Sequence, residues 1–181
     1  MCNNLLEGLI AQYNGIRGVV AMRKLKIYLD TSVVSHLDAQ DTPDKMADTH
    51  KLWDAIIAGE FEVVLSSVDF EELLVCSPDK RAILAEYLVR IPYTLVEVDY
   101  DVVRIAEKFV DLGILKQKSI DDCRHIAAAI VSKCDVIVSW NFKHIVNHKT
   151  MQGVKAVTAL EGYSDLLIYT PTTLIGGEDD E

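Results

Sequence analysis

The chain lacks the features that mark small secreted proteins and membrane proteins. Its four cysteines, Cys2, Cys76, Cys123 and Cys134, stand at irregular spacings without a C-x-x-C pair, so we expect free thiols rather than a disulfide framework. No apolar run reaches the roughly 18 residues that a membrane span needs. The start of the chain also lacks the charged and continuous apolar regions of a secretory signal. These absences predict a cytoplasmic protein with no membrane association.

Positive charge is scarce as well. The 18 Lys and Arg residues are outnumbered by 28 Asp and Glu residues, which gives a formal net charge of −10. Such a balance argues against a broad electrostatic surface for duplex DNA or an anionic membrane. It leaves room for an enzyme that holds a short nucleic-acid segment in a local groove, where a few cations set the sign of the potential.

Half of the 181 residues are hydrophobic, which is typical of a buried parallel sheet covered by helices on both faces. Apolar strand-like runs alternate with helical patterns, and this order predicts one doubly wound α/β domain with a parallel sheet. The strands are expected at residues 25–29, 61–67, 93–98, 135–140 and 153–157. The expected layout is an N-terminal extension at residues 1–21, the domain at 22–170 and a disordered acidic tail at 171–181.

The stretch LKIYLDTSVVSHL, residues 25–37, predicts both a strand and a site. A buried strand ends at Asp30, and Thr31 or Ser32 is placed to cap the helix that follows. In open α/β sheets, ligands bind beyond the carboxyl ends of the strands. Asp30 is therefore either a turn residue on the surface or part of a binding site, and this stretch alone favours neither reading.

Two further acidic positions stand in comparable places. Glu71 or Glu72 lies early in the helix after the second strand, and Asp121 or Asp122 opens the helix before the fourth. Acids in a first helical turn are often explained by the helix dipole alone. Three acids that converge on one end of a parallel sheet favour a site instead, because they repel one another unless a cation lies between them.

Hard carboxylate oxygens of this kind suit Mg²⁺ or Mn²⁺ rather than zinc. Such an ion can lower the pKa of a bound water and offset charge on a phosphoryl oxygen. Hydrolysis of a phosphodiester is the chemistry that this arrangement predicts.

Four stretches together resemble the successive motifs of the PIN domain, the metal-dependent ribonuclease fold of VapC-type toxins. In chain order they read LKIYLDTSVVSHL, VVLSSVDFEELL, SIDDCRHIAAAI and DVIVSWNFKHIVN. The resemblance covers residue 24 to about residue 169. It implies a three-layer α/β/α sandwich with a mostly parallel central sheet.

The resemblance also implies a set of site residues. Asp30 takes the place of the family's first aspartate, Glu72 fits the second acidic position better than Glu71, and Asp122 fits the third better than Asp121. These three would hold the metal. Ser32 takes the place of the hydroxyl that follows the first aspartate.

The fourth position of the family pattern departs from the usual acid. The chain reads Ser139-Trp140-Asn141, and Asn141 can assist through its carbonyl oxygen without adding charge. His144 stands where the family often has an aspartate, and its expected role is to satisfy the turn, with contact to substrate as the alternative.

The activity that the resemblance implies is endoribonuclease cleavage by a metal-activated water, which leaves 5′-phosphate and 3′-hydroxyl ends. Nearby cations could form a local positive rim for RNA, although solvated surface is the ordinary role for each: Lys116, Lys118, Arg124 and Lys143. A toxin of this family would have an antitoxin partner and commonly forms a homodimer.

Two other readings stay open beside the ribonuclease. A non-catalytic PIN-like module for protein or RNA interaction is favoured by Asn141 and by the net charge. A haloacid-dehalogenase-type phosphatase also begins on a strand that ends in Asp, but it needs a second Asp where Ser32 stands.

Overall fold

One parallel sheet forms the centre of the computed structural model, which describes residues 23–176. The strand order is β3-β2-β1-β4-β5, and every neighbouring pair is parallel. The strands are β1 (Leu25–Leu29), β2 (Phe61–Ser66), β3 (Thr94–Val96), β4 (Val136–Val138) and β5 (Leu167–Tyr169). The doubly wound parallel sheet expected from the sequence is confirmed, with β1 in the middle.

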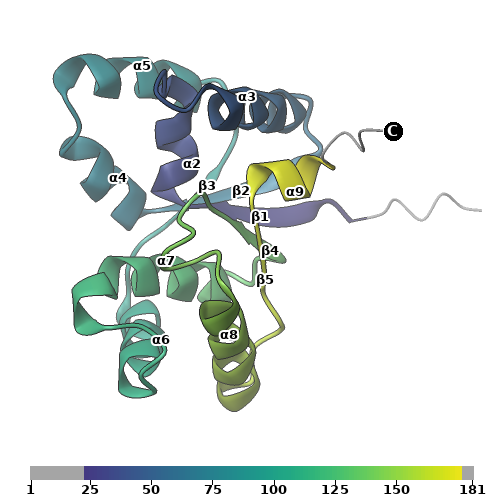
Figure 1. The fold of residues 1–181 in the computed structure, drawn as a ribbon. Coiled ribbons are helices and arrows are strands. Elements are labelled where there is room, and N and C mark those ends of the chain that lie inside the picture. Colours follow the sequence, from purple (N-terminus) through teal and green to yellow (C-terminus); the bar gives the residue numbers. More distant parts are fainter. Residues whose placement is uncertain (1–22, 177–181) are drawn as a thin grey trace, which may run out of the picture.

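Helices cover both faces of the sheet and complete a three-layer α/β/α sandwich (Figure 1). One face carries α2 (Thr31–Ser35), α3 (Pro43–Ile57), α4 (Ser67–Leu74), α5 (Pro78–Leu88) and α9 (Pro171–Ile175). The other carries α6 (Tyr100–Asp111), α7 (Ile120–Val131) and α8 (His148–Glu161). Short 3₁₀ turns at His36–Asp38 and Gln117–Ser119 follow α2 and precede α7.

The middle strand is buried on both faces because its side chains alternate between two cores. Ile27 and Leu29 pack into the core beneath α2, α3 and α5, whereas Tyr28 packs into the core beneath α6, α7 and α8. All three side chains are inaccessible to solvent. This explains why three consecutive residues of β1, Ile27, Tyr28 and Leu29, are apolar.

One predicted strand is wrong. Residues 153–157 form part of α8, and the fifth strand is Leu167–Tyr169. The buried positions of α8 follow helical spacing, three or four residues apart: Thr150, Gly153, Val154, Val157 and Thr158. Asn147 fixes the start of this helix, since its side chain accepts a hydrogen bond from the Thr150 amide. A five-residue window was too short to show the longer period.

Ordered structure continues past residue 170, where the sequence places the end of the domain. The hydroxyl of Thr172 in α9 donates to the Asp48 carboxylate in α3 at 2.6 Å, so α9 belongs to the sandwich and the predicted boundary is too early. Residues 1–21 and the last five residues of the predicted tail lie outside the described residues. Within residues 23–176, no helix is long and apolar enough to cross a membrane.

Candidate metal centre

Asp30 is held at the carboxyl end of the middle strand. Its amide donates to the Val138 carbonyl of β4 at 3.0 Å, and its own carbonyl accepts from the Val33 amide in α2 at 2.8 Å. Asp30 itself, rather than Thr31 or Ser32 as the sequence predicts, is the N-cap residue of α2. Its side chain makes no capping hydrogen bond. The carboxylate therefore remains available to the site.

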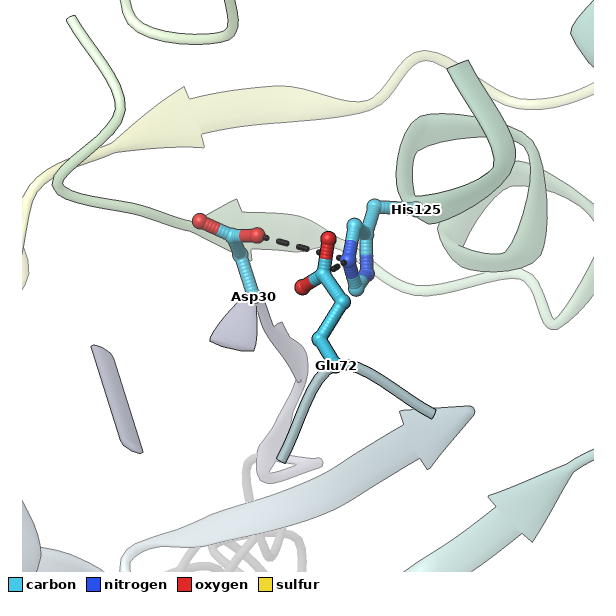
Figure 2. Close-up of side chains that lie close together, drawn as sticks. All are labelled: Asp30, Glu72 and His125. Atoms are coloured by element: carbon cyan, nitrogen blue, oxygen red, sulfur yellow. Dashed lines mark hydrogen bonds and ion pairs between the residues drawn. The ribbon is translucent and has the colours of Figure 1, made fainter. Parts of the chain in front are cut away.

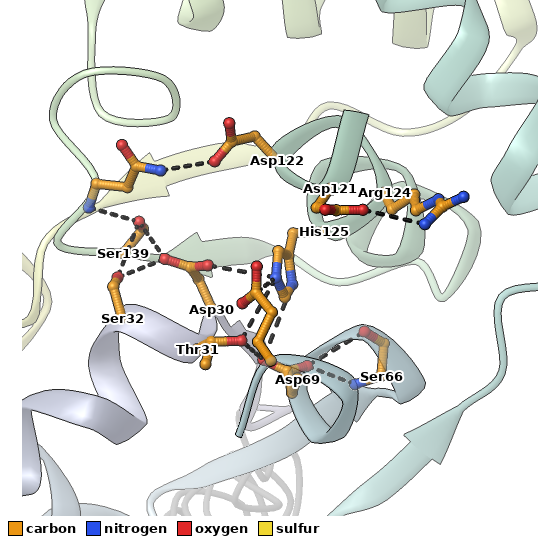
Figure 3. Close-up of polar contacts among 12 residues, drawn as sticks. Asp30, Thr31, Ser32, Ser66, Asp69, Asp121, Asp122, Arg124, His125 and Ser139 are labelled. Atoms are coloured by element: carbon orange, nitrogen blue, oxygen red, sulfur yellow. Dashed lines mark hydrogen bonds and ion pairs between the residues drawn. The ribbon is translucent and has the colours of Figure 1, made fainter. Parts of the chain in front are cut away.

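Two hydroxyls fix the orientation of this carboxylate. Ser32 and Ser139 both donate to Asp30 Oδ2, the second at 2.6 Å (Figure 3). The hydroxyls are oriented in turn by backbone amides, because the Trp140 amide donates to Ser32 at 2.9 Å and the Asn141 amide to Ser139 at 2.9 Å. Ser32, predicted as a secondary site residue, thus contacts Asp30 directly. The other carboxylate oxygen of Asp30 faces His125.

Glu72 and His125 complete a compact group with Asp30 (Figure 2). His125 Nε2 lies 3.2 Å from Glu72 Oε2 and 3.6 Å from Asp30 Oδ1. One ligand atom from each of the three residues lies within 4.8 Å of the others. Asp30 follows the end of β1, and Glu72 and His125 come from α4 and α7, so the three meet at the carboxyl edge of the sheet. The donor set of two carboxylates and one imidazole fits a divalent cation.

The imidazole of His125 carries a proton in the metal-free protein. Burial alone would lower its pKa, but the charge of Asp69, the hydrogen bond to Glu72 and the charge of Asp30 outweigh burial and raise the pKa to about 10. The same contact lowers the pKa of Glu72, against the effect of its own burial. At neutral pH the imidazolium offsets the carboxylates, and it must lose a proton before Nε2 can act as a metal ligand.

Asp69 and Tyr28 contact His125 on its Nδ1 side and belong to a buried polar network. Tyr28 Oη lies 2.7 Å from His125 Nδ1 and donates to Asp69 at 3.1 Å. Asp69 also accepts from the Ser66 amide at 2.8 Å and from the Thr31 hydroxyl at 3.0 Å. Burial raises the pKa of Asp69 and, with the charge of Asp69, that of Tyr28.

Sequence reasoning missed His125, Asp69 and Tyr28. The sequence held a signal for two of them. His125 directly precedes the apolar run of residues 126–131, and Asp69 stands three residues after Ser66, which is the spacing of a capping box. The capping box accounts for Asp69 locally, so its link to His125 emerges only from the fold. Tyr28 has no comparable signal, because it reads as an ordinary strand residue.

Asp122 and Asn141 form a second pair beside this group. The Asn141 amide group donates to Asp122 Oδ1 at 2.7 Å, and its carbonyl oxygen accepts from the His144 amide at 3.0 Å. Burial and the charge of Asp30 raise the pKa of the half-buried Asp122, while His144 acts to lower it. Asp122 is not a member of the close group of Asp30, Glu72 and His125.

The remaining predicted candidates lie at the margin. Glu71 is exposed. Asp121 is also exposed and pairs with Arg124 at 3.0 Å (Figure 3). His144 is half-buried, and its hydrogen bonds with Asn141 and Thr150 are made by its backbone amide and carbonyl. Of the two pairs of adjacent acids, Glu72 contacts His125 beside Asp30 and Asp122 accepts from Asn141, whereas Glu71 and Asp121 are exposed.

Replacing Tyr28 with phenylalanine tests the buried network. The substitution removes the hydroxyl that contacts His125, Ser66 and Asp69, and we expect the free energy of unfolding to fall by about 1–3 kcal/mol because buried partners lose a hydrogen bond. Urea denaturation with EDTA present measures the change. Tyr87→Phe is the matched control, since no hydrogen bond to the Tyr87 hydroxyl is seen among the described residues. Equal losses in the two variants would contradict the role of the network.

The fold and the site together define a PIN-like α/β domain with an acidic centre at the carboxyl edge of its sheet. A chain in the crystal structure of VapBC2 from Rickettsia felis, bound to a DNA fragment from their promoter, is similar in fold. The TM-score is 0.50 with 13% sequence identity, over 81% of this chain and 98% of that chain. No protein-family model and no curated protein matches the sequence.

Proposed function

We propose that this protein is a metal-dependent endoribonuclease of the PIN-domain, VapC-like type. The observation that carries the proposal is the group of Asp30, Glu72 and His125, whose ligand atoms lie within 4.8 Å of one another at the carboxyl edge of a parallel sheet. Ligands bind at this edge in open α/β sheets. The PIN-like fold supports the same conclusion.

Asp30 and Glu72 would hold Mg²⁺ or Mn²⁺, with Asp122 as the third acid and Asn141 as its hydrogen-bonding neighbour. When bound, such an ion supplies a water of lowered pKa and offsets charge on the phosphoryl oxygens. The protein's own contribution is orientation. Ser32 and Ser139 orient the Asp30 carboxylate, and Asn141 orients Asp122, so that these two carboxylates are held in place before an ion binds.

The likeness to VapBC2 supports a finer proposal. The chain would act as the toxin of a type II toxin-antitoxin pair, with an antitoxin as its protein partner. The homodimer and the cytoplasmic location stay predictions. Gel filtration of the full chain tests the homodimer, and the identity of the neighbouring gene tests the antitoxin partner; neither measurement depends on activity.

A non-catalytic PIN-like interaction module is the second candidate. Asn141 contributes no charge, and the imidazolium of His125 offsets part of the negative charge of the acids around it, so the site depends less on an ion than three unpaired carboxylates would. This candidate predicts an intact fold that neither binds Mg²⁺ or Mn²⁺ nor cuts RNA.

Titration of a short single-stranded RNA with Mg²⁺ or Mn²⁺ separates the two candidates. We expect cleavage by the wild type to require the ion, and Asp122→Asn to reduce the rate at least about 10-fold, as losses of metal-site residues do. The adjacent Asp121→Asn is the matched control and should cut as the wild type does, since its side chain pairs with Arg124 on the surface. Absence of both cleavage and metal binding in the wild type would leave the interaction module as the better reading.

A further inference from the structure

A groove of about 250 Å³ lies beside the candidate metal centre. It is formed by the turn before α7, by the segment between β4 and α8, and by the first turn of α8. The residues that line it are Ile114, Leu115, Lys116, Lys118, Ser119, Lys143, His144, Asn147, Lys149 and Thr150. We call it the lysine groove.

The charges in the lysine groove are all of one sign. Lys116, Lys118, Lys143 and Lys149 line it, and no Asp or Glu does. Within residues 23–176, none of the four forms an ion pair with a carboxylate; Lys149 donates to a neutral group, the Gly113 carbonyl, at 2.7 Å. In a chain with a net charge of −10, such a grouping creates a local positive potential that suits an anionic ligand.

Contacts between separate elements of the fold hold the walls of the groove in place. The contact between Lys149 and Gly113 ties the first turn of α8 to the end of α6. The Thr150 hydroxyl donates to the His144 carbonyl at 2.7 Å, which anchors the segment that carries Lys143. Gly153 of α8 lies so close to Ile114 that a Cβ at this position would clash with the Ile114 side chain. The groove is therefore present before any ligand arrives.

One end of the groove adjoins the carboxylates. His144 lines the groove, and its backbone amide donates to the Asn141 side chain, which in turn donates to Asp122. Ser119, also in the lining, is the N-cap residue of α7, the helix that carries Asp122 in its first turn. A polymer with regularly spaced anions could thus occupy the groove and the metal centre together.

We infer that the lysine groove binds the phosphates of single-stranded RNA next to the bond placed at the metal centre, an inference that rests on the proposed function. Lysine ammonium groups act as point charges on phosphates. The inference also revises the positive rim expected from the sequence. Lys149 joins it, whereas Arg124 does not, because Arg124 pairs with Asp121 outside the groove lining.

The test compares two double variants of the full chain that change the net charge equally. Lys116→Gln/Lys143→Gln removes two exposed groove lysines, and Lys133→Gln/Lys155→Gln removes two exposed lysines outside it. Lys133 follows the last turn of α7, about 17 Å along the helix from Asp122. Fluorescence anisotropy with a labelled single-stranded RNA measures binding in EDTA and again in Ca²⁺, and circular dichroism checks the fold.

We expect the groove variant to raise Kd at least about 10-fold and to reduce the slope of log K against log salt by about 1.4, since each lost phosphate contact on a single strand removes about 0.7. The control variant should shift both far less. Equal behaviour of the two variants, or no RNA binding by the wild type in either condition, would overturn the inference. Failure of the proposed function looks different, because RNA would then bind through the groove without being cut in Mg²⁺ or Mn²⁺.

Discussion

Replacement of Asp30 by asparagine is expected to reduce metal-dependent RNA cleavage by at least about 100-fold, beyond the usual effect of residues that only support a metal ligand. Of the three acids proposed to hold the ion, Asp30 is the only buried one, and it is oriented by two hydroxyls on one oxygen and by a close approach to His125 on the other. Asparagine keeps the shape of the side chain but removes the charge that attracts the ion. The rate should therefore fall while the fold remains.

The measurement is the cleavage rate across a range of Mg²⁺ or Mn²⁺ concentrations, together with thermal unfolding in EDTA. Asp121→Asn again serves as the control, because it removes one carboxylate charge from an exposed surface pair. An Asp30→Asn protein that cuts as fast as the wild type would remove Asp30 from the proposed mechanism. If the variant unfolds, Glu72→Gln provides the same test, since the side chain of Glu72 is 41% exposed and can be changed with less effect on the core.

Replacement of His125 by glutamine is expected to lower the free energy of unfolding at neutral pH by about 3–5 kcal/mol, the usual effect of removing one partner from a buried charge pair. The side chain of His125 is 1% exposed and lies against Asp69, Asp30 and Glu72. Without the imidazolium, Asp69 would be left buried without a cation. Added Mg²⁺ or Mn²⁺ should restore part of the loss, because an ion can replace the missing positive charge.

The pH dependence follows from the raised pKa of His125. This pKa is about 10 in the folded protein and 6.5 ordinarily, so the folded state binds one more proton than the unfolded state between these values. The stabilisation is complete below pH 6.5 and is lost as the pH rises towards 10, with a slope of at most about 1.4 kcal/mol per pH unit.

Urea denaturation in EDTA across this pH range checks the prediction. The wild type should lose stability as the pH rises, the His125→Gln variant should lack this slope, and the two should converge near pH 10. The exposed His148→Gln should follow the wild type throughout. Parallel curves for wild type and His125→Gln would show that His125 carries no proton in the folded protein.

The sequence was sufficient to predict the parallel sheet and the position of Asp30 at the end of a buried strand, because both depend on local signals. A buried strand that ends in an acid predicts where that acid lies, and parallel topology brings the ends of β1, β2 and β4 to one edge. The preference for Glu72 over Glu71 came from the family pattern and agrees with the contact between Glu72 and His125. The all-parallel sheet and its PIN-like likeness confirm the fold class.

The rest of the site depends on contacts between residues far apart in the chain. His125 meets Tyr28 across 97 positions and Glu72 across 53, and no periodicity within α7 signals either contact. Asp122 was expected to join Asp30 and Glu72 directly, but its nearest polar partner is Asn141, which lies on the loop after β4. The error at residues 153–157 has a local cause instead. Five residues span fewer than two helical turns, so their apolar pattern does not distinguish a strand from part of α8.

The burial of the two carboxylates closest to His125 is unequal, and this sets how the centre can respond to an ion. The Asp30 side chain is 6% exposed and follows directly on the middle strand, which is paired on both sides, whereas the Glu72 side chain is 41% exposed on α4. Moving Asp30 would require breaking the middle of the sheet. Glu72 has room to change rotamer because its side chain is partly exposed, although such a change would break its contact with His125. The centre thus combines a fixed carboxylate, Asp30, with an adjustable one, Glu72. Ions of different radius can be accommodated by movement of Glu72 while Asp30 and the core stay in place.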